Sequence, residues 1–175
     1  MSTPPRLRPH RLSVVLLHPQ IAPNTGNVAR SCVATGTHLH LVRPMGFILS
    51  DRNLRRSAMD YWERLKLTVH DDDDSFFQWV QRNGGGVHLF TSKAEQSVWD
   101  ARFADGDWLI FGSETAGIPP EILQSFPGRG LRIPQIPGER CLNLATAAGV
   151  ALYEALRQIH APMVQSPPIQ FGDVT

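Results

Sequence analysis

The stretch LSVVLLHPQIAPNTGNVARSCVATG (residues 12–36) predicts a strand, a loop and a helix, in that order. Its opening segment, 12–18, is mostly apolar and stops at Pro19, a pattern typical of a strand buried on both faces of a parallel sheet. Apolar residues spaced four apart then predict a helix over residues 27–35, and Gly36 is a residue type that commonly ends helices. A strand that leads directly into a helix is the repeating unit of α/β folds.

The loop inside this stretch is rich in Pro, Asn, Thr and Gly, which are the residue types of tight turns. Asn24 or Thr25 is therefore expected to cap the helix. Turn chemistry does not account for Arg30, which lies off the line of apolar residues on the helix and can face a cleft. Because a single helical arginine is commonly just a solvated charge, the stretch by itself leaves both interpretations of Arg30 open.

The same alternation continues along the chain. Further strands are expected at residues 38–44, 65–70, 87–92, 107–112 and 130–134, and further helices at residues 50–65, 71–83, 119–126 and 141–159. The acidic run 71–74 suits a helix start that faces solvent. Strands that alternate with helices predict an α/β fold, with a mostly parallel sheet flanked by helices.

The composition limits the classes of function. The chain has 175 residues, of which 42% are hydrophobic, and this suits one globular domain with a proper core. Lys and Arg number 17 against 16 Asp and Glu, so any surface that binds a phosphate backbone must be local. The domain is expected to span residues 12–160, between a flexible N-terminal segment, 1–11, and a Pro-rich tail, 161–175.

Neither a membrane span nor a metal site is expected. The N-terminus has no apolar signal core, and no apolar run approaches the roughly 20 residues of a membrane helix, which predicts a cytoplasmic protein. The two cysteines, Cys32 and Cys141, are far apart and form no CxxC motif, so they indicate reduced thiols. His38 and His40 share a strand face, but no third ligand is evident near them.

A second junction, LIFGSETAGIPPEIL (residues 109–123), has two glycines in a tight loop. Gly112 follows the predicted strand and can let a ligand approach the backbone, and Gly117 lies further along the loop. Glu114 lies inside the loop, which leads to a helix N-terminus with free amides. The pattern favours a nucleotide-like ligand. It is not GxGxxG, a P-loop or GxSxG, so dinucleotide, NTP and hydrolase classes lose support.

A third junction, RIPQIPGERCLNLATAAGVALYEALRQ (residues 132–158), leads from the last predicted strand into the last helix. Small residues are frequent in that helix and allow close packing of another backbone, whatever the function. Arg140 and Asn143 precede or open the helix and are the better site candidates. Since ligands of parallel sheets bind beyond the carboxyl ends of the strands, all three junctions are expected at that edge.

Together the three junctions resemble the motifs of the SPOUT superfamily of RNA methyltransferases. The matching segments are PNTGNVAR (23–30) with LHLVRPMGF (39–47) for the first motif, FGSETAGIP (111–119) for the second, residues 132–158 for the third, and LRRSAMDYW (54–62) between them. The resemblance covers about residues 12–160. Within the superfamily, the chain is most similar to the small, single-domain tRNA 2′-O-methyltransferases that modify the wobble nucleotide.

The resemblance implies a fold whose C-terminal segment is threaded into a deep trefoil knot, an exception to the rule against knots. The knot would form a pocket for S-adenosylmethionine (AdoMet), held bent and largely by backbone atoms, with no metal. The family is homodimeric, and each active site draws on both subunits. The positions that match its cofactor contacts are Phe90, Gly112, Ile133 and Cys141, with Gly117 and Leu142 nearby.

The implied reaction moves the activated methyl group of AdoMet to the 2′-hydroxyl of nucleotide C34 or U34 of tRNA. Arg30 matches the arginine of the first motif, which is proposed to act on that hydroxyl with help from an RNA phosphate. Because arginine stays protonated in proteins, we expect Arg30 to orient the phosphate and the hydroxyl, and whether it takes the proton stays open. Asn24, Glu114 and Asn143 match polar positions of the same site.

Four residues are expected to contact RNA through the resemblance. Arg55 and Arg56 share one face of a predicted helix, and Arg140 lies beside the cofactor motif. Tyr153 can stack or hydrogen-bond near the site, or it can be a packing residue. The N-terminal arginines are expected to be ordinary solvated charges. A dimer would present the basic patch twice.

The sequence departs from the family pattern at four positions. Ser113 stands where proline is usual, Ala116 where arginine is common, and Cys141 and Ala145 replace two serines. These departures affect the exact substrate more than methyl transfer itself. Two alternatives therefore stay open: 2′-O-methylation of another tRNA position or of rRNA, and a relative that binds RNA without catalysis.

Overall fold

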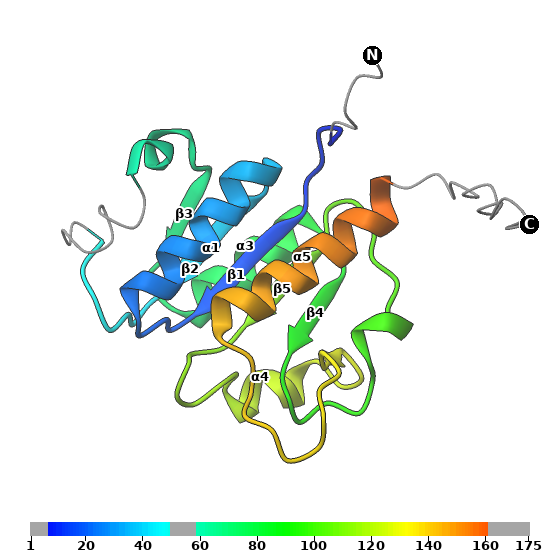
Figure 1. The fold of residues 1–175 in the computed structure, drawn as a ribbon. Coiled ribbons are helices and arrows are strands. Elements are labelled where there is room, and N and C mark those ends of the chain that lie inside the picture. The colour runs from blue at the N-terminus through cyan, green and yellow to red at the C-terminus, as the bar shows by residue number, and fades with distance from the viewer. Residues whose placement is uncertain (1–6, 50–58, 161–175) are drawn as a thin grey trace, which may run out of the picture.

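The computed structural model describes residues 7–49 and 59–160 of the chain. In that part, six strands form one sheet in which every neighbouring pair is parallel. The strands are β1 (Ser13–Leu17), β2 (His38–Val42), β3 (Leu67–His70), β4 (Val87–Phe90), β5 (Trp108–Phe111) and β6 (Gly130–Leu131). Their order across the sheet is β3-β2-β1-β5-β4-β6 (Figure 1). The predicted α/β fold with a mostly parallel sheet is confirmed.

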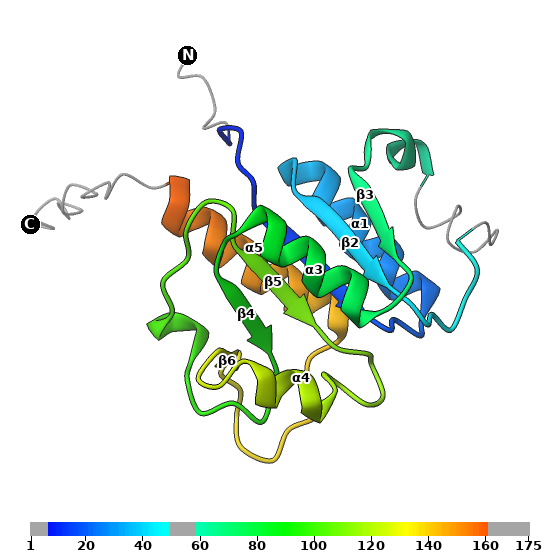
Figure 2. The same ribbon diagram turned by 180° about the vertical axis from the view of Figure 1, so that it is seen from behind.

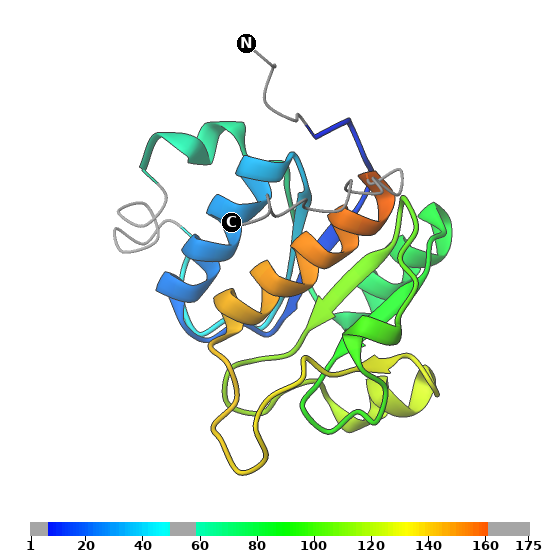
Figure 3. The same cartoon turned by 45° about the vertical axis from the view of Figure 1, so that its right-hand side comes forward.

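Helices cover both faces of this sheet. The α-helices are α1 (Ala22–Thr35), α3 (Asp73–Asn83), α4 (Pro120–Ser125) and α5 (Leu144–His160), and the 3-10 helices are η1 (Met59–Arg64) and η2 (Val98–Asp100). Helices α1 and α5 lie side by side on one face, as Figure 3 shows. Helices α3 and α4 lie on the other face, which Figure 2 brings forward. The fold therefore has three layers.

Strand β1 lies inside the sheet and is buried on both sides. Val14 and Leu16 belong to the core under α1 and α5, whereas Val15 and Leu17 belong to the core under α3 and α4. All four side chains are fully buried. Burial of each contributes about 1.5–3 kcal/mol to folding, which explains the uninterrupted apolar run and confirms this predicted strand.

Helix α1 starts earlier than the sequence predicts. Pro23 lies in its first turn, where the missing N–H of proline costs no hydrogen bond. The prediction that Asn24 or Thr25 caps the helix is wrong. Both residues are buried within α1, and the residue at the capping position, Ile21, makes no side-chain cap. The cap comes instead from a distant loop, described below.

The other helix ends follow their capping residues. Gly36 ends α1 as predicted, with a φ of 76°. Asp72 caps α3 by accepting a hydrogen bond from the backbone N–H of Ser75 at 2.7 Å, so α3 starts inside the acidic run. Helix α5 starts later than residue 141 because Asn143 caps it.

Two further predictions change in detail. The acidic run 71–74 faces solvent except at Asp73, whose carboxylate lies 3.1 Å from the Nε2 of His18 and whose pKa is raised by burial. The helix predicted over residues 50–65 lies partly outside the described residues, and its described part is the 3-10 helix η1. Within the described ranges, no helix is both long and apolar enough to cross a bilayer.

Candidate active site

The carboxyl edge of the sheet carries the three loops that the sequence singles out. Residues 18–21 lead from β1 to α1, residues 112–119 lead from β5 to α4, and residues 132–143 lead from β6 to α5. In Figure 1 the strand arrows point toward these loops. Strand β1 lies between β2 and β5, so the chain turns to opposite sides of the sheet at this point. Such a change of direction is where α/β sheets bind ligands.

Glu114 caps α1 from the second loop. Its Oε2 accepts a hydrogen bond from the backbone N–H of Gln20 at 2.9 Å. Its Oε1 accepts from the backbone N–H of Ile21 at 3.3 Å and from the Nδ2 of Asn24 at 3.0 Å. A negative charge at a helix N-terminus is stabilising by about 0.3–1 kcal/mol. The carboxylate thus stabilises the start of α1 and holds the second loop against the first.

Asn143 ties the third loop to the same place. Its Nδ2 donates to the Oδ1 of Asn24 at 2.9 Å, while its own Oδ1 accepts from the N–H of Ala145 at 2.9 Å at the start of α5. We call the connected side chains of Asn143, Asn24 and Glu114 the polar chain. The three polar residues expected at the site therefore come together: Glu114 from the second loop, Asn143 from the third, and Asn24 from the first turn of α1.

Arg30 lies on a different side of α1 from Asn24. Successive residues of an α-helix turn by about 100°, which puts Arg30 on an outer stripe with Pro23, Asn27 and Ala34, all of them exposed. Within one chain, the structure therefore separates Arg30 from the polar chain around the helix, although the sequence expects both at one site.

The loop after β5 is a tight turn closed by its own backbone. The N–H of Ser113 donates to the O of Gly117 at 3.1 Å, and the N–H of Gly117 donates to the O of Ser113 at 2.9 Å. Gly117 has a φ of 71°, which favours glycine. A Cβ on Gly112 would overlap the backbone of Gly117 and Ile118. The sequence predicts that a ligand approaches the backbone at Gly112. On the side where a Cβ would lie, the backbone of Gly117 and Ile118 makes this close approach instead.

The residues expected to contact the cofactor come from the same edge. Phe90 ends β4, is buried, and stacks on Phe111 with ring centroids 4.7 Å apart. Ile133 follows β6 and is half-buried, whereas Cys141 and Leu142 are exposed just before α5. Apolar side chains with a few polar groups between them are the typical lining of a small-molecule site.

Two of the residues expected to bind RNA are exposed: Arg140 near this edge of the sheet and Tyr153 on α5. Arg140 lies in the loop before α5, and its backbone O accepts from the Nε2 of Gln135 at 3.0 Å. Tyr153 has 56% of its surface exposed, so packing within the chain does not explain it. Arg55 and Arg56 lie outside the described residues.

The cysteines are both free thiols. Cys32 is buried in the core, and burial raises its pKa to about 12, while Cys141 is exposed. Across residues 7–49 and 59–160, no group of His, Cys, Asp and Glu is placed to hold a metal ion. The sequence missed one buried pair, His40 and His70, whose Nδ1 and Nε2 lie 3.0 Å apart. Its only sequence signal was one histidine inside the predicted strand 38–44 and one at the end of the predicted strand 65–70.

A parallel sheet whose carboxyl-edge loops are joined by a polar chain defines a class: α/β proteins that bind a ligand where the strand order changes direction. The chain belongs to the SpoU rRNA Methylase family, whose model matches residues 11–153. This is the family that the three sequence motifs indicated.

Individual relatives are similar over most of their length. The tRNA (cytidine(34)-2′-O)-methyltransferase of Burkholderia cenocepacia (strain HI2424) is 44% identical over 147 residues, which are 83% of this chain and 94% of that protein. A solved structure described as giving structural insights into the 2-OH methylation of C/U34 on tRNA is 47% identical. It has a TM-score of 0.81 and covers 85% of this chain and 96% of that one.

A more distant structure shares the fold with a cofactor bound. The SpoU methyltransferase AviRb from Streptomyces viridochromogenes, in complex with AdoMet, is 25% identical with a TM-score of 0.76. The match covers 89% of this chain and 62% of that one.

Proposed function

We propose that this protein transfers a methyl group from AdoMet to the 2′-hydroxyl of the wobble nucleotide, C34 or U34, of tRNA. The observation that carries the proposal is the similarity to a C34 methyltransferase, at 44% identity, and to a structure of C/U34 methylation, at 47% identity. The matches cover 94% and 96% of the length of those two proteins. The polar chain supports it, because it joins the three family motifs at one edge of the sheet.

The edge residues fit AdoMet. Ile133 and Leu142 offer apolar surface for the adenine ring, and backbone groups at Phe90, at Gly112 and in the loop at Cys141 can bind the polar atoms of AdoMet. AdoMet supplies a methyl group already activated on a sulfonium, so the protein needs no metal and no nucleophile of its own. The task of the chain is then to align the ribose hydroxyl with that methyl group.

The polar chain and Arg30 have different roles in this proposal. Asn24, Glu114 and Asn143 position the starts of α1 and α5 and hold the loops that would surround the cofactor. Arg30 binds the RNA phosphate beside the target ribose and orients the 2′-hydroxyl through its fixed N–H donors. Arg140, Arg55 and Arg56 add further phosphate contacts.

The proposal includes a homodimer. The outer stripe of α1 carries one charge, Arg30, and the neighbouring side of α5 exposes Val150 and Tyr153, which are 42% and 56% exposed. Exposed apolar groups on adjacent helices suit a symmetric contact with a second copy. Since Arg30 lies around α1 from the polar chain of its own protomer, it would serve the partner's site. A tRNA substrate implies action in the cytoplasm.

The deciding experiment is mass spectrometry of tRNA nucleosides from cells that lack the gene. Loss of 2′-O-methylcytidine and 2′-O-methyluridine at position 34, restored by the gene, is the expected result. Unchanged levels would reject the wobble assignment. Methyl transfer to purified tRNA against purified rRNA then separates the alternative substrates. AdoMet binding by calorimetry without single-turnover transfer would identify a non-catalytic relative.

A further inference from the structure

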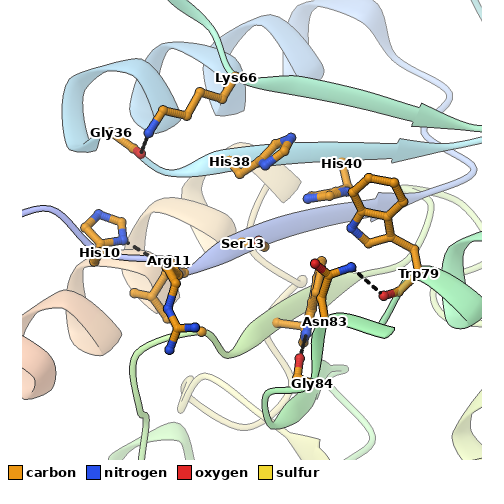
Figure 4. Close-up of a pocket in the computed structure, with 13 residues that line it drawn as sticks. His10, Arg11, Ser13, Gly36, His38, His40, Lys66, Trp79, Asn83 and Gly84 are labelled. Atoms are coloured by element: carbon orange, nitrogen blue, oxygen red, sulfur yellow. Dashed lines mark hydrogen bonds between the residues drawn. The ribbon is translucent and has the colours of Figure 1, made fainter. Parts of the chain in front are cut away.

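A cavity of about 280 Å³ lies at the edge of the sheet opposite the candidate active site. Its walls come from the amino ends of β1, β2 and β5, from the residue before β3, from Gly36 after α1, and from the last turns of α3 (Figure 4). The volume is just below the range for small-molecule sites, about 300–1,000 Å³. A strand of five residues is about 17 Å long, which separates the two edges.

The charge of this cavity is positive. Arg11 and Lys66 line it, and no carboxylate of the described residues does. Lys66 is exposed, with its Nζ 3.4 Å from the O of Gly36. Asp105 does not line the cavity. Its two carboxylate oxygens accept hydrogen bonds from Arg11, one from the backbone N–H and one from the Nε. The guanidinium has four more N–H donors, so the cavity favours an anion.

Aromatic rings form part of the remaining wall. The rings of His38 and His40 are 4.1 Å apart with 33° between their planes, and Trp108 meets His40 edge-on at 5.1 Å. Trp79 is 39% exposed, with its ring 6.3 Å from that of His40. Burial lowers the pKa of His38, with Lys66 adding to the effect, and lowers the pKa of His40 to about 3. Both imidazoles are therefore neutral, flat surfaces at neutral pH.

The cationic and the aromatic residues occupy different parts of the cavity. Figure 4 shows His38 between Lys66 and Trp79, and the guanidinium of Arg11 on the other side of the cavity from the ammonium of Lys66. The Nδ2 of Asn83 donates to the O of Trp79 at 2.8 Å, which leaves its Oδ1 to accept from a ligand. A ligand that fits has a flat aromatic group with N–H donors at one end and an anion at the other.

We propose that this cavity binds a single nucleotide, with the base against Trp79 and His38 and the phosphate held by Lys66, while Arg11 adds positive charge on the other side of the cavity. Stacking on aromatic side chains tolerates any base, while the ammonium of Lys66 attracts the phosphate. The nucleotide comes either from a free mononucleotide or from an unpaired position of an RNA strand. An RNA bound at the opposite edge can reach over a distance of about 17 Å.

The test is calorimetric titration of the full chain with CMP, with S-adenosylhomocysteine present to fill the cofactor site. Trp79→Ala and Lys66→Ala are each expected to raise the Kd by about five- to tenfold, as loss of one stacking or one charged contact does. Arg82→Ala is the matched control, because Arg82 is exposed on the same helix as Trp79 but does not line the cavity. Its Kd should equal that of the wild type. Cytidine and inorganic phosphate should each bind more weakly than CMP.

Two results would overturn the proposal: no CMP binding at millimolar concentration, or equal affinity in the wild type and both variants. Lys66 is exposed, so Lys66→Ala keeps the test valid even if Trp79→Ala unfolds. Binding of tRNA to the same proteins identifies the source of the nucleotide. Weaker tRNA binding in both variants points to RNA, and unchanged tRNA binding points to a free nucleotide. None of these measurements depends on methyl transfer, so their outcome is separate from that of the proposed function.

Discussion

Asn24 uses both ends of its side-chain amide. Its Nδ2 donates to Glu114 at 3.0 Å, and its Oδ1 accepts from Asn143 at 2.9 Å. A carboxamide is required here, because an aspartate could only accept and an apolar residue could do neither. Since Asn24 is only 8% exposed, water cannot readily replace a lost partner. The link between the third loop and Glu114 therefore runs through Asn24, whereas Glu114 also holds the first loop directly through Gln20 and Ile21.

Asn24→Asp tests this link with almost no change in shape. The new carboxylate would face that of Glu114 with no hydrogen between them, so we expect a loss of about 1–3 kcal/mol in unfolding free energy. Urea denaturation measures it. The control is Asn27→Asp, the same change at an exposed position one turn along α1. Equal stability of the two variants would show that the polar chain does not hold the loops.

Arg30→Ala separates RNA orientation from cofactor binding. Because Arg30 is exposed and lies away from the loops of its own protomer, we expect AdoMet affinity to stay within about twofold of the wild type. Single-turnover methyl transfer should fall by about 10²-fold or more, as when a positioned charge is lost from a reacting group. An equal fall in AdoMet affinity, measured by calorimetry, would make Arg30 a structural residue. Arg30→Lys, which keeps the charge without the planar donors, should recover only part of the rate.

Among the helices and strands, the sequence correctly predicted the features that depend on residues close together in the chain. The apolar run of β1 reflects burial on both faces, and Gly36 ends α1 by its own backbone conformation. The start of α1 was predicted wrongly because its cap, Glu114, lies 94 positions away from Gln20. The three loops were expected at one edge, but the hydrogen bonds that join them span 90 and 119 positions. A single sequence carries no signal for such pairings.

The stability of the fold depends on pH through two buried histidines, His40 of β2 and His70 of β3. Burial lowers the pKa of both imidazoles, that of His40 to about 3, and the neighbouring His38 lowers both further. In the unfolded chain a histidine titrates near its ordinary pKa of about 6.5. Between those values the unfolded state binds more protons than the folded state. Stability is therefore complete above about pH 6.5 and falls as the pH is lowered toward 3.

His40→Gln removes one of these titrations and keeps a polar partner for His70. Between pH 6.5 and 4.5, the slope of unfolding free energy against pH should become shallower by up to about 1.4 kcal/mol per pH unit. Urea denaturation at a series of pH values measures the slope. Above pH 7 the two curves should run parallel, which serves as the internal control. Parallel curves at all pH values would mean that His40 is protonated in the folded state.

At the scale of the whole molecule, α1 and α5 each have an outward side with exposed residues, measured over residues 7–49 and 59–160. The core is complete beneath both helices, since Ala148, Ala151 and Leu152 of α5 are buried there. The outward side of α5 exposes Val150 and Tyr153 one turn apart. A second copy of the chain on this face would bury those side chains and bring Arg30 of each protomer toward the other.

Val150→Lys combined with Tyr153→Lys tests this arrangement. On the proposed dimer, two like charges from each chain would meet across the symmetric contact. We therefore expect the wild type to sediment at twice the mass of the chain, and the variant to sediment as a single 19.5 kDa chain. Methyl transfer to tRNA should fall with the dimer, while thermal unfolding of the monomer changes little because both side chains are exposed. The matched control is Asp74→Lys, an exposed change on α3 at the opposite face. A wild-type chain that transfers methyl groups at full rate as a monomer would contradict the shared site, and Arg30 would then act within its own protomer.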